Sequence, residues 1–115
     1  MKPVFSSNDI EKTEFEDRWV KFAFGNRGFQ ASDSLELGIV EFKPGTEPLV
    51  HSHDVDEALY VIKGKGKIEI GNNWFSLDKG KFAYIPKGET HRLESMQGHS
   101  LKILFIFGGK TKINY

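Results

Sequence analysis

The feature that most constrains this chain is a period-two alternation of apolar and polar residues in short runs broken by glycine and proline. Runs of this kind, rich in β-branched and aromatic side chains and bounded by turn residues, are typical of β-strands. We therefore expect strands over residues 18–24, 35–42, 57–63, 67–70, 81–85, 90–95 and 101–107.

Glycine and proline between these runs predict tight turns. Gly64-Lys65-Gly66 predicts a hairpin turn between the runs at 57–63 and 67–70. Helix is expected only as one turn over 10–15, capped by Asn8 or Asp9. Many short strands with almost no helix predict an all-β antiparallel sandwich or small barrel.

The length of 115 residues predicts a single domain over 1–115, with an N-terminal arm over 1–30 and a barrel core over 35–107. Some strands are apolar at both parities, as at 101–107. One face of such a strand lines the barrel, and the other needs a second sheet or another subunit to cover it. This pattern favours a homodimer.

Composition excludes several classes of function. Lys+Arg and Asp+Glu are both 16, so the formal net charge is zero, and we expect neither nucleic acid nor an anionic membrane as the partner. The absence of cysteine excludes disulfides, thiolate zinc sites and thiol nucleophiles. The first twenty residues show no signal-peptide pattern, and the apolar run at 103–107 is far shorter than the roughly 20 residues of a membrane span. We expect a cytoplasmic protein.

Histidines are the residues of chemical interest. His51 and His53 stand at i and i+2, so in an extended segment both side chains point to one face. Glu57 follows four residues after His53, and His91 opens a later strand that antiparallel pairing could bring opposite the first pair. Two imidazoles and a carboxylate aimed at one point suit a first-row divalent metal. The alternative is an exposed acidic loop beside structural histidines.

The spacing of glycines, proline and these residues resembles the two motifs of the cupin superfamily, in the form found in small single-domain cupins. Gly45-x5-His51-x-His53-x3-Glu57-x6-Gly64 matches the first motif without a gap. Gly80-x5-Pro86-x-Gly88-x2-His91 matches the second, except that its last position, usually Asn, is Ser95. The resemblance implies an antiparallel double-stranded β-helix, the jelly-roll or cupin barrel.

The resemblance also implies that His51, His53, Glu57 and His91 bind one divalent transition metal inside the barrel. The ligand types do not choose among Fe, Mn, Zn, Ni, Co and Cu. On a six-coordinate ion the four ligands leave two positions open for water, substrate or dioxygen. Ser95 in place of Asn leaves the ligand set intact and affects a local turn or a hydrogen bond in the pocket.

Strand parity predicts the rest of the cavity. The expected apolar lining is Leu59, Val61, Leu93, Ile103, Phe105, Leu37 and Ile39. Tyr84 and Ser95 are the candidate catalytic residues, Tyr84 at the mouth and Ser95 on the same face as His91.

Three functions remain open. The first is a metal-dependent enzyme on a small organic substrate, of the dioxygenase type that uses metal and O2. The second is a non-oxidative isomerase or lyase in which the metal acts as a Lewis acid. The third is a non-catalytic cupin that binds a sugar or a carboxylate. The mostly apolar lining favours a compact, weakly charged substrate.

Overall fold

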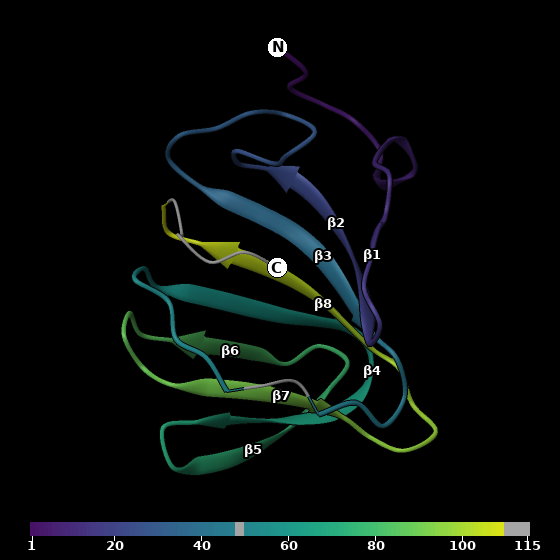
Figure 1. Ribbon diagram of the computed structural model, residues 1–115, viewed down its shortest axis with the longest axis vertical. Coiled ribbons are helices and arrows are strands. Elements are labelled where there is room, and N and C mark those ends of the chain that lie inside the picture. The colour runs from purple at the N-terminus through teal and green to yellow at the C-terminus, as the bar shows by residue number, and fades with distance from the viewer. Residues whose placement is uncertain (48–49, 110–115) are drawn as a thin grey trace.

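The computed structural model describes residues 1–47 and 50–109, and its regular structure is almost entirely β-strand (Figure 1). After a single 3-10 turn, η1 (Ser7–Asp9), come eight strands: β1 (Thr13–Glu14), β2 (Arg18–Phe24), β3 (Glu36–Phe42), β4 (Glu57–Ile70), β5 (Asn73–Asp78), β6 (Phe82–Ile85), β7 (His91–Ser95) and β8 (Leu101–Phe107). All strand pairs are antiparallel, which confirms the predicted fold class. In the described ranges no helix has the length and apolar character needed to cross a membrane.

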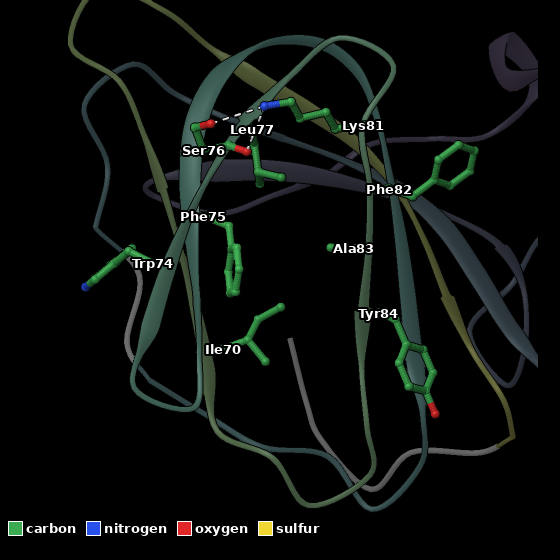
Figure 2. Close-up of a pocket in the computed structure, with 9 residues that line it drawn as sticks. All are labelled: Ile70, Trp74, Phe75, Ser76, Leu77, Lys81, Phe82, Ala83 and Tyr84. Carbon is green, nitrogen blue, oxygen red and sulfur yellow. Dashed lines mark hydrogen bonds between the residues drawn. The ribbon is translucent and has the colours of Figure 1, made fainter.

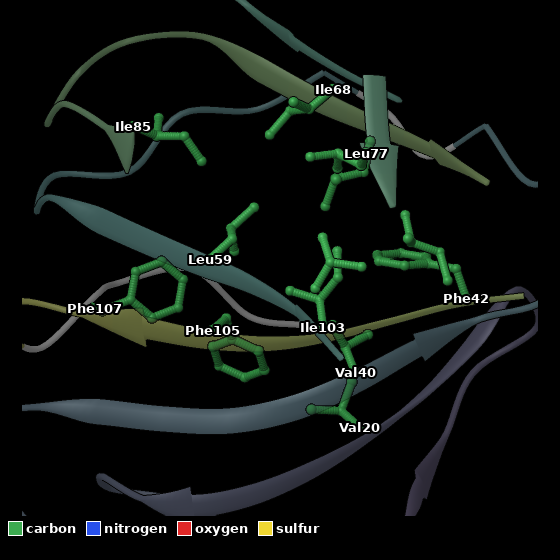
Figure 3. Packing of buried hydrophobic residues seen from close by; sticks show 13 residues of the cluster. Val20, Val40, Phe42, Leu59, Ile68, Leu77, Ile85, Ile103, Phe105 and Phe107 are labelled. Atoms are coloured by element: carbon green, nitrogen blue, oxygen red, sulfur yellow. The ribbon is translucent and has the colours of Figure 1, made fainter. Parts of the chain in front are cut away.

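Strand β4 is shared by two sheets. Its first half pairs with β6 on one side and β8 on the other, and the first sheet continues from β8 through β3 and β2 to β1. Its second half pairs with β5 and β7, which form the second sheet. The two sheets face each other (Figure 1), and the buried hydrophobic side chains lie between them (Figure 3).

The predicted hairpin turn at Gly64-Lys65-Gly66 is wrong, because these residues lie within β4, a continuous strand of 14 residues. Gly64 has a φ of +98°, and a Cβ there would collide with the backbone carbonyl oxygen of Ser100. A Cβ on Gly66 would likewise meet the carbonyl oxygen of Glu94. These glycines permit the close backbone approach where β4 passes from the first sheet to the second.

Two further local predictions differ from the structure. Strand β5 is not among the expected strands, although it contains Trp74, Phe75 and Leu77, and it pairs with the second half of β4. The predicted helical turn at 10–15 is wrong: the turn is η1, and Ser6 caps it. The Ser6 hydroxyl accepts from the Asn8 amide, and the Ser6 amide donates to the Asp9 carboxylate at 2.9 Å. This reciprocal pair fixes the turn earlier in the chain.

The core fills the space between the sheets with aliphatic and phenyl side chains (Figure 3). The inward parity predicted for β4, β7 and β8 is confirmed, because Leu59, Val61, Leu93, Ile103 and Phe105 are all buried.

The prediction for β3 is wrong. Leu37 and Ile39 lie on its outer face, while Glu36, Gly38, Val40 and Phe42 face inward. Both parities of β3 are apolar at its centre, so alternation alone could not choose the face. Packing against β8 determines which face is buried. An added Cβ at Gly38 would lie 2.7 Å from Cζ of the Phe105 ring, so the ring occupies the space that the glycine leaves.

Candidate metal centre

The four predicted ligands come together at one end of the barrel. Glu57 is the first residue of β4 and His91 the first residue of β7. The segment before β4 reaches them through an isolated antiparallel bridge. The His51 amide donates to the His91 carbonyl at 3.1 Å, and the His91 amide donates to the His51 carbonyl at 2.9 Å. The bridge holds His51 against His91, and His53 follows two residues later on the same face.

The side chains converge closely. The potential ligand atoms of His51, His53 and His91 all lie within 4.8 Å of one another. The Glu57 Oε1 atom lies 3.4 Å from His53 Nε2 and 3.2 Å from His91 Nε2. The three imidazoles are close enough together for a single ion to contact all of them, and the Glu57 carboxylate lies beside two of the three.

Hydrogen bonding supports this arrangement. His53 Nδ1, Glu57 Oε1 and His91 Nδ1 are buried side-chain atoms without a hydrogen-bond partner among the residues that the structure describes. The short approach of Glu57 Oε1 to two imidazoles is thus a contact without hydrogen-bond geometry. An unsatisfied buried polar atom costs free energy unless something binds it. A divalent cation would satisfy the carboxylate oxygen, so these residues fit a metal.

The protonation state of His53 also suits a metal. The pKa of His53 is lowered from 6.5 to about 4, mainly because the side chain is buried and also because His91 and His51 lie nearby, against a smaller opposing effect of Asp54. His53 is therefore neutral near pH 7 and offers a lone pair. The Phe107 ring packs against the His53 ring with centroids 4.6 Å apart, which shields this side of the site from water.

Access to the site is one-sided. His53, Glu57 and His91 are buried, whereas His51 is exposed. Three imidazoles and one carboxylate are ligands that first-row divalent metals accept, and they leave coordination positions open on a six-coordinate ion. A small molecule would reach those positions from the His51 side.

Ser95 lies at the other end of β7 from His91 and is buried. Its hydroxyl donates to the Lys43 carbonyl at 2.6 Å and accepts from the Thr46 amide at 2.8 Å, and the two hydroxyls of Ser95 and Thr46 lie 3.0 Å apart. These bonds tie the loop after β3 to β7. The structure does not bring Ser95 to the histidines.

Tyr84 lies on the outer face of β6 and is 59% exposed. Its hydrogen bond with the Asp56 carboxylate raises the pKa of the phenol. Asp56 Oδ1 also accepts from the Lys87 amide at 2.8 Å, so the tyrosine belongs to a surface network around the loop after β6. The structure does not bring Tyr84 to the ligand atoms.

Glu36 is an acidic residue that the sequence reasoning missed. It is 6% exposed, and strand register places it in one inward-facing row with Phe107 and Glu57. The nearest guanidinium nitrogen of Arg27 lies 3.9 Å from its carboxylate. Its parity with the buried Val40 was the available signal, and the apolar side chains on the opposite parity obscured it.

Comparison with known proteins agrees with the geometry. A family model of the cupin domain matches residues 38–107. An uncharacterised protein of Methanocaldococcus jannaschii, MJ1618, is 34% identical over 61 residues, which are 52% of this chain and 49% of that protein. The chain thus spans about half the length of this relative.

Among solved structures, the polyketide cyclase RemF from Streptomyces resistomycificus superposes with a TM-score of 0.84 at 16% identity, over 98% of this chain and 83% of that one. The DMSP lyase DddQ from Ruegeria pomeroyi gives 0.81 at 18% identity, over 93% of this chain and 60% of that one. Identities this low show the fold alone, and that fold is the jelly-roll barrel.

Proposed function

This chain belongs to the cupin family, and we propose that it is a metal-dependent enzyme acting on a small organic molecule. The observation that carries the proposal is the convergence of three imidazoles and an unpaired buried carboxylate oxygen at one end of the barrel. Fold alone does not assign a reaction, so the proposal rests on this site.

In the proposed site His51, His53, Glu57 and His91 hold one divalent metal, which is Fe, Mn, Zn, Ni, Co or Cu. Bound there, the metal would supply Lewis-acid polarisation of a substrate oxygen or, if redox-active, electron transfer to dioxygen. The protein residues do the remaining work. The buried Phe107 and Leu59 exclude water from the inner side, and the exposed side at His51 admits the substrate.

Two reaction types are proposed for this site. The first is dioxygenase chemistry, in which the positions left free by four protein ligands suit substrate and O2 together. The second is non-oxidative isomerase or lyase chemistry. The names of two proteins with this fold, a polyketide cyclase and a DMSP lyase, favour the second.

The test is turnover with and without oxygen. Protein loaded separately with Fe, Mn, Co, Ni, Cu or Zn would be incubated with a panel of small keto acids, hydroxy acids and enols. Substrate loss would be followed by NMR and O2 uptake by electrode, with Glu57→Gln as the inactive control. Oxygen uptake matched to substrate loss supports the dioxygenase, and equal turnover without oxygen supports the isomerase or lyase. Saturable binding with no turnover of any bound compound would replace the enzyme with a carboxylate- or sugar-binding protein.

We also propose that two copies of the chain associate through the outer face of the first sheet. A hollow of about 350 Å³ on this face is lined only by apolar and aromatic residues of β4, β6 and β8, among them Phe82, which is 79% exposed, and Ile106, which is 38% exposed. A two-fold axis would place this patch against itself. Light scattering is expected to give the mass of a dimer for the wild type and of a monomer for Ile106→Lys, and a wild-type monomer would refute it.

A further inference from the structure

We propose that the gap between strands β5 and β6 holds the flat, apolar part of the substrate, while an oxygen-donor head of the same molecule reaches the metal ligands. The substrate class is an aromatic or conjugated ring that carries a carboxylate together with a neighbouring hydroxyl or enol oxygen. This inference rests on the proposed metal-dependent function and adds the substrate class to it.

The gap is an opening in the barrel wall. Among the described strands, β5 and β6 each pair only with β4, and they pair with different halves of it. Between them lies a hollow of about 580 Å³, a volume typical of small-molecule sites (Figure 2). At one end the Lys81 ammonium donates to the Ser76 hydroxyl at 3.1 Å and so spans the gap.

The side chain of Phe75 is more exposed than its neighbours on the same face, and this exposed ring marks where a ligand would lie. Phe75 is paired with Ile68, which is 1% exposed, and shares its face of β5 with Leu77, which is 4% exposed. Phe75 itself is 52% exposed. Figure 2 shows its ring in the gap, with Ala83 of β6 on the other side. Because Ala83 is small, no side chain among the described residues fills the space beside the phenyl ring, and a flat ring could occupy it.

The other end of the hollow adjoins the metal centre. Ile70 lines the hollow there and is the register partner of His91. Tyr84 lines the opposite side at the same end, and the next residue, Ile85, is the register partner of Glu57. The four ligand residues do not themselves line the hollow, so the oxygen-donor head of a molecule bound there would extend past Ile70 to reach them.

The scarcity of charged side chains in the hollow argues against a ligand whose charge would lie inside it. Among the described residues, Lys81 is the only charged side chain that lines the hollow, and it already contacts the Ser76 hydroxyl and, at 3.6 Å, the Asp78 carboxylate. A phosphosugar would require free arginine or lysine donors here. The charge of the ligand must then sit on the head that faces the metal.

The test is calorimetric titration of zinc-loaded protein with two probes, salicylate, which has a ring and a head, and oxalate, which has a head alone. The variant Ala83→Phe fills the hollow, and Ala31→Phe is the control, since it adds the same ring to an exposed position that lines neither this hollow nor the one proposed for association of two copies. Ala83→Phe is expected to weaken salicylate binding at least tenfold and to leave oxalate binding and zinc content unchanged. Ala31→Phe should alter the binding of neither probe.

A second variant guards against misfolding. Phe75→Ala removes one wall of the hollow at a half-exposed position and should weaken salicylate binding several-fold. In the wild type, the methyl NMR signals of Ile70 and Ala83 should shift when salicylate binds but not when oxalate binds. Salicylate binding that is unchanged in both variants would overturn the role of the hollow while leaving the metal site standing. Hollow-dependent salicylate binding that is the same with and without zinc would instead overturn the metal-dependent function. A change of molecular mass in Ala83→Phe without loss of salicylate binding would assign the gap to a second copy of the chain and refute the proposal.

Discussion

The two ends of strand β7 carry polar side chains, His91 and Ser95, that are both buried but differ in whether the protein satisfies their hydrogen bonds. At one end, Ser95 has its hydroxyl engaged by the Lys43 carbonyl and the Thr46 amide. At the other end, the Nδ1 atom of His91 and the neighbouring Glu57 Oε1 have no hydrogen-bond partner within residues 1–47 and 50–109. A buried polar atom that its own chain satisfies indicates structure, and one that its own chain leaves unsatisfied indicates a ligand. The comparison separates the proposed metal centre from Ser95, which the sequence analysis placed on the same face as His91.

The largest expected effect is on metal affinity in Glu57→Gln. The amide removes the ligand charge, and affinity should fall at least about 100-fold, the upper end of what loss of a supporting residue costs. Competition with a chromophoric chelator measures it. Glu36→Gln is the matched control, because it neutralises a carboxylate in the same buried row and should stay within about twofold. An equal loss in both variants would mean that the effect belongs to any buried charge at this end.

The next effect is the pH dependence of stability in chelator-treated protein. The pKa of His53 is lowered from 6.5 to about 4 in the folded state, so between these values the unfolded chain binds more protons. The free energy of unfolding should therefore fall as pH falls from about 6.5 to 4, by on the order of 2–3 kcal/mol. Urea unfolding at a series of pH values measures it, and His53→Gln should flatten the profile. A wild-type profile that is already flat would contradict the burial of a neutral His53.

Ser95→Ala should lower stability by about 1–2 kcal/mol, because the Thr46 amide and the Lys43 carbonyl lose their partner. Metal affinity should not change, since the hydroxyl is at the far end of β7. Chemical denaturation and the chelator competition give the two numbers. If Ser95→Ala kept wild-type stability but lost metal affinity, Ser95 would have to belong to the metal site.

The smallest effect is expected for Tyr84→Phe. The phenol is on the outer face of β6 and contacts Asp56 at the surface, so stability should change by no more than about 0.5 kcal/mol. Metal affinity should stay within about twofold in the same competition assay. A tenfold loss would show that Tyr84 reaches the metal centre in solution.

Much of the site could be predicted because its signals are local. Two histidines at i and i+2 share a face in any extended segment, and the turn with Pro86 and Gly88 sets His91 at the start of a strand. The alternation in β4 and β8 gave the inner face correctly, since Glu57 and Leu59 share a parity and are both buried.

The features that were missed depend on contacts between distant segments. Gly64 and Gly66 have the composition of a turn, and only the approach of Ser100 and Glu94 shows that they serve a crossing of strands. Strand β5 exists because β4 continues far enough to pair with it. The hollow beside Phe75 exists because strands β5 and β6 do not pair with each other, and no local sequence pattern predicts that absence of pairing.

The most direct measurement is the metal content per chain of untagged protein purified without added metal, with Glu57→Gln prepared in parallel. Elemental analysis is expected to find close to one divalent transition metal per wild-type chain and far less in the variant. Essentially no metal in the wild type, with none regained on reconstitution with any of the six metals, would contradict a metal centre at His51, His53, Glu57 and His91.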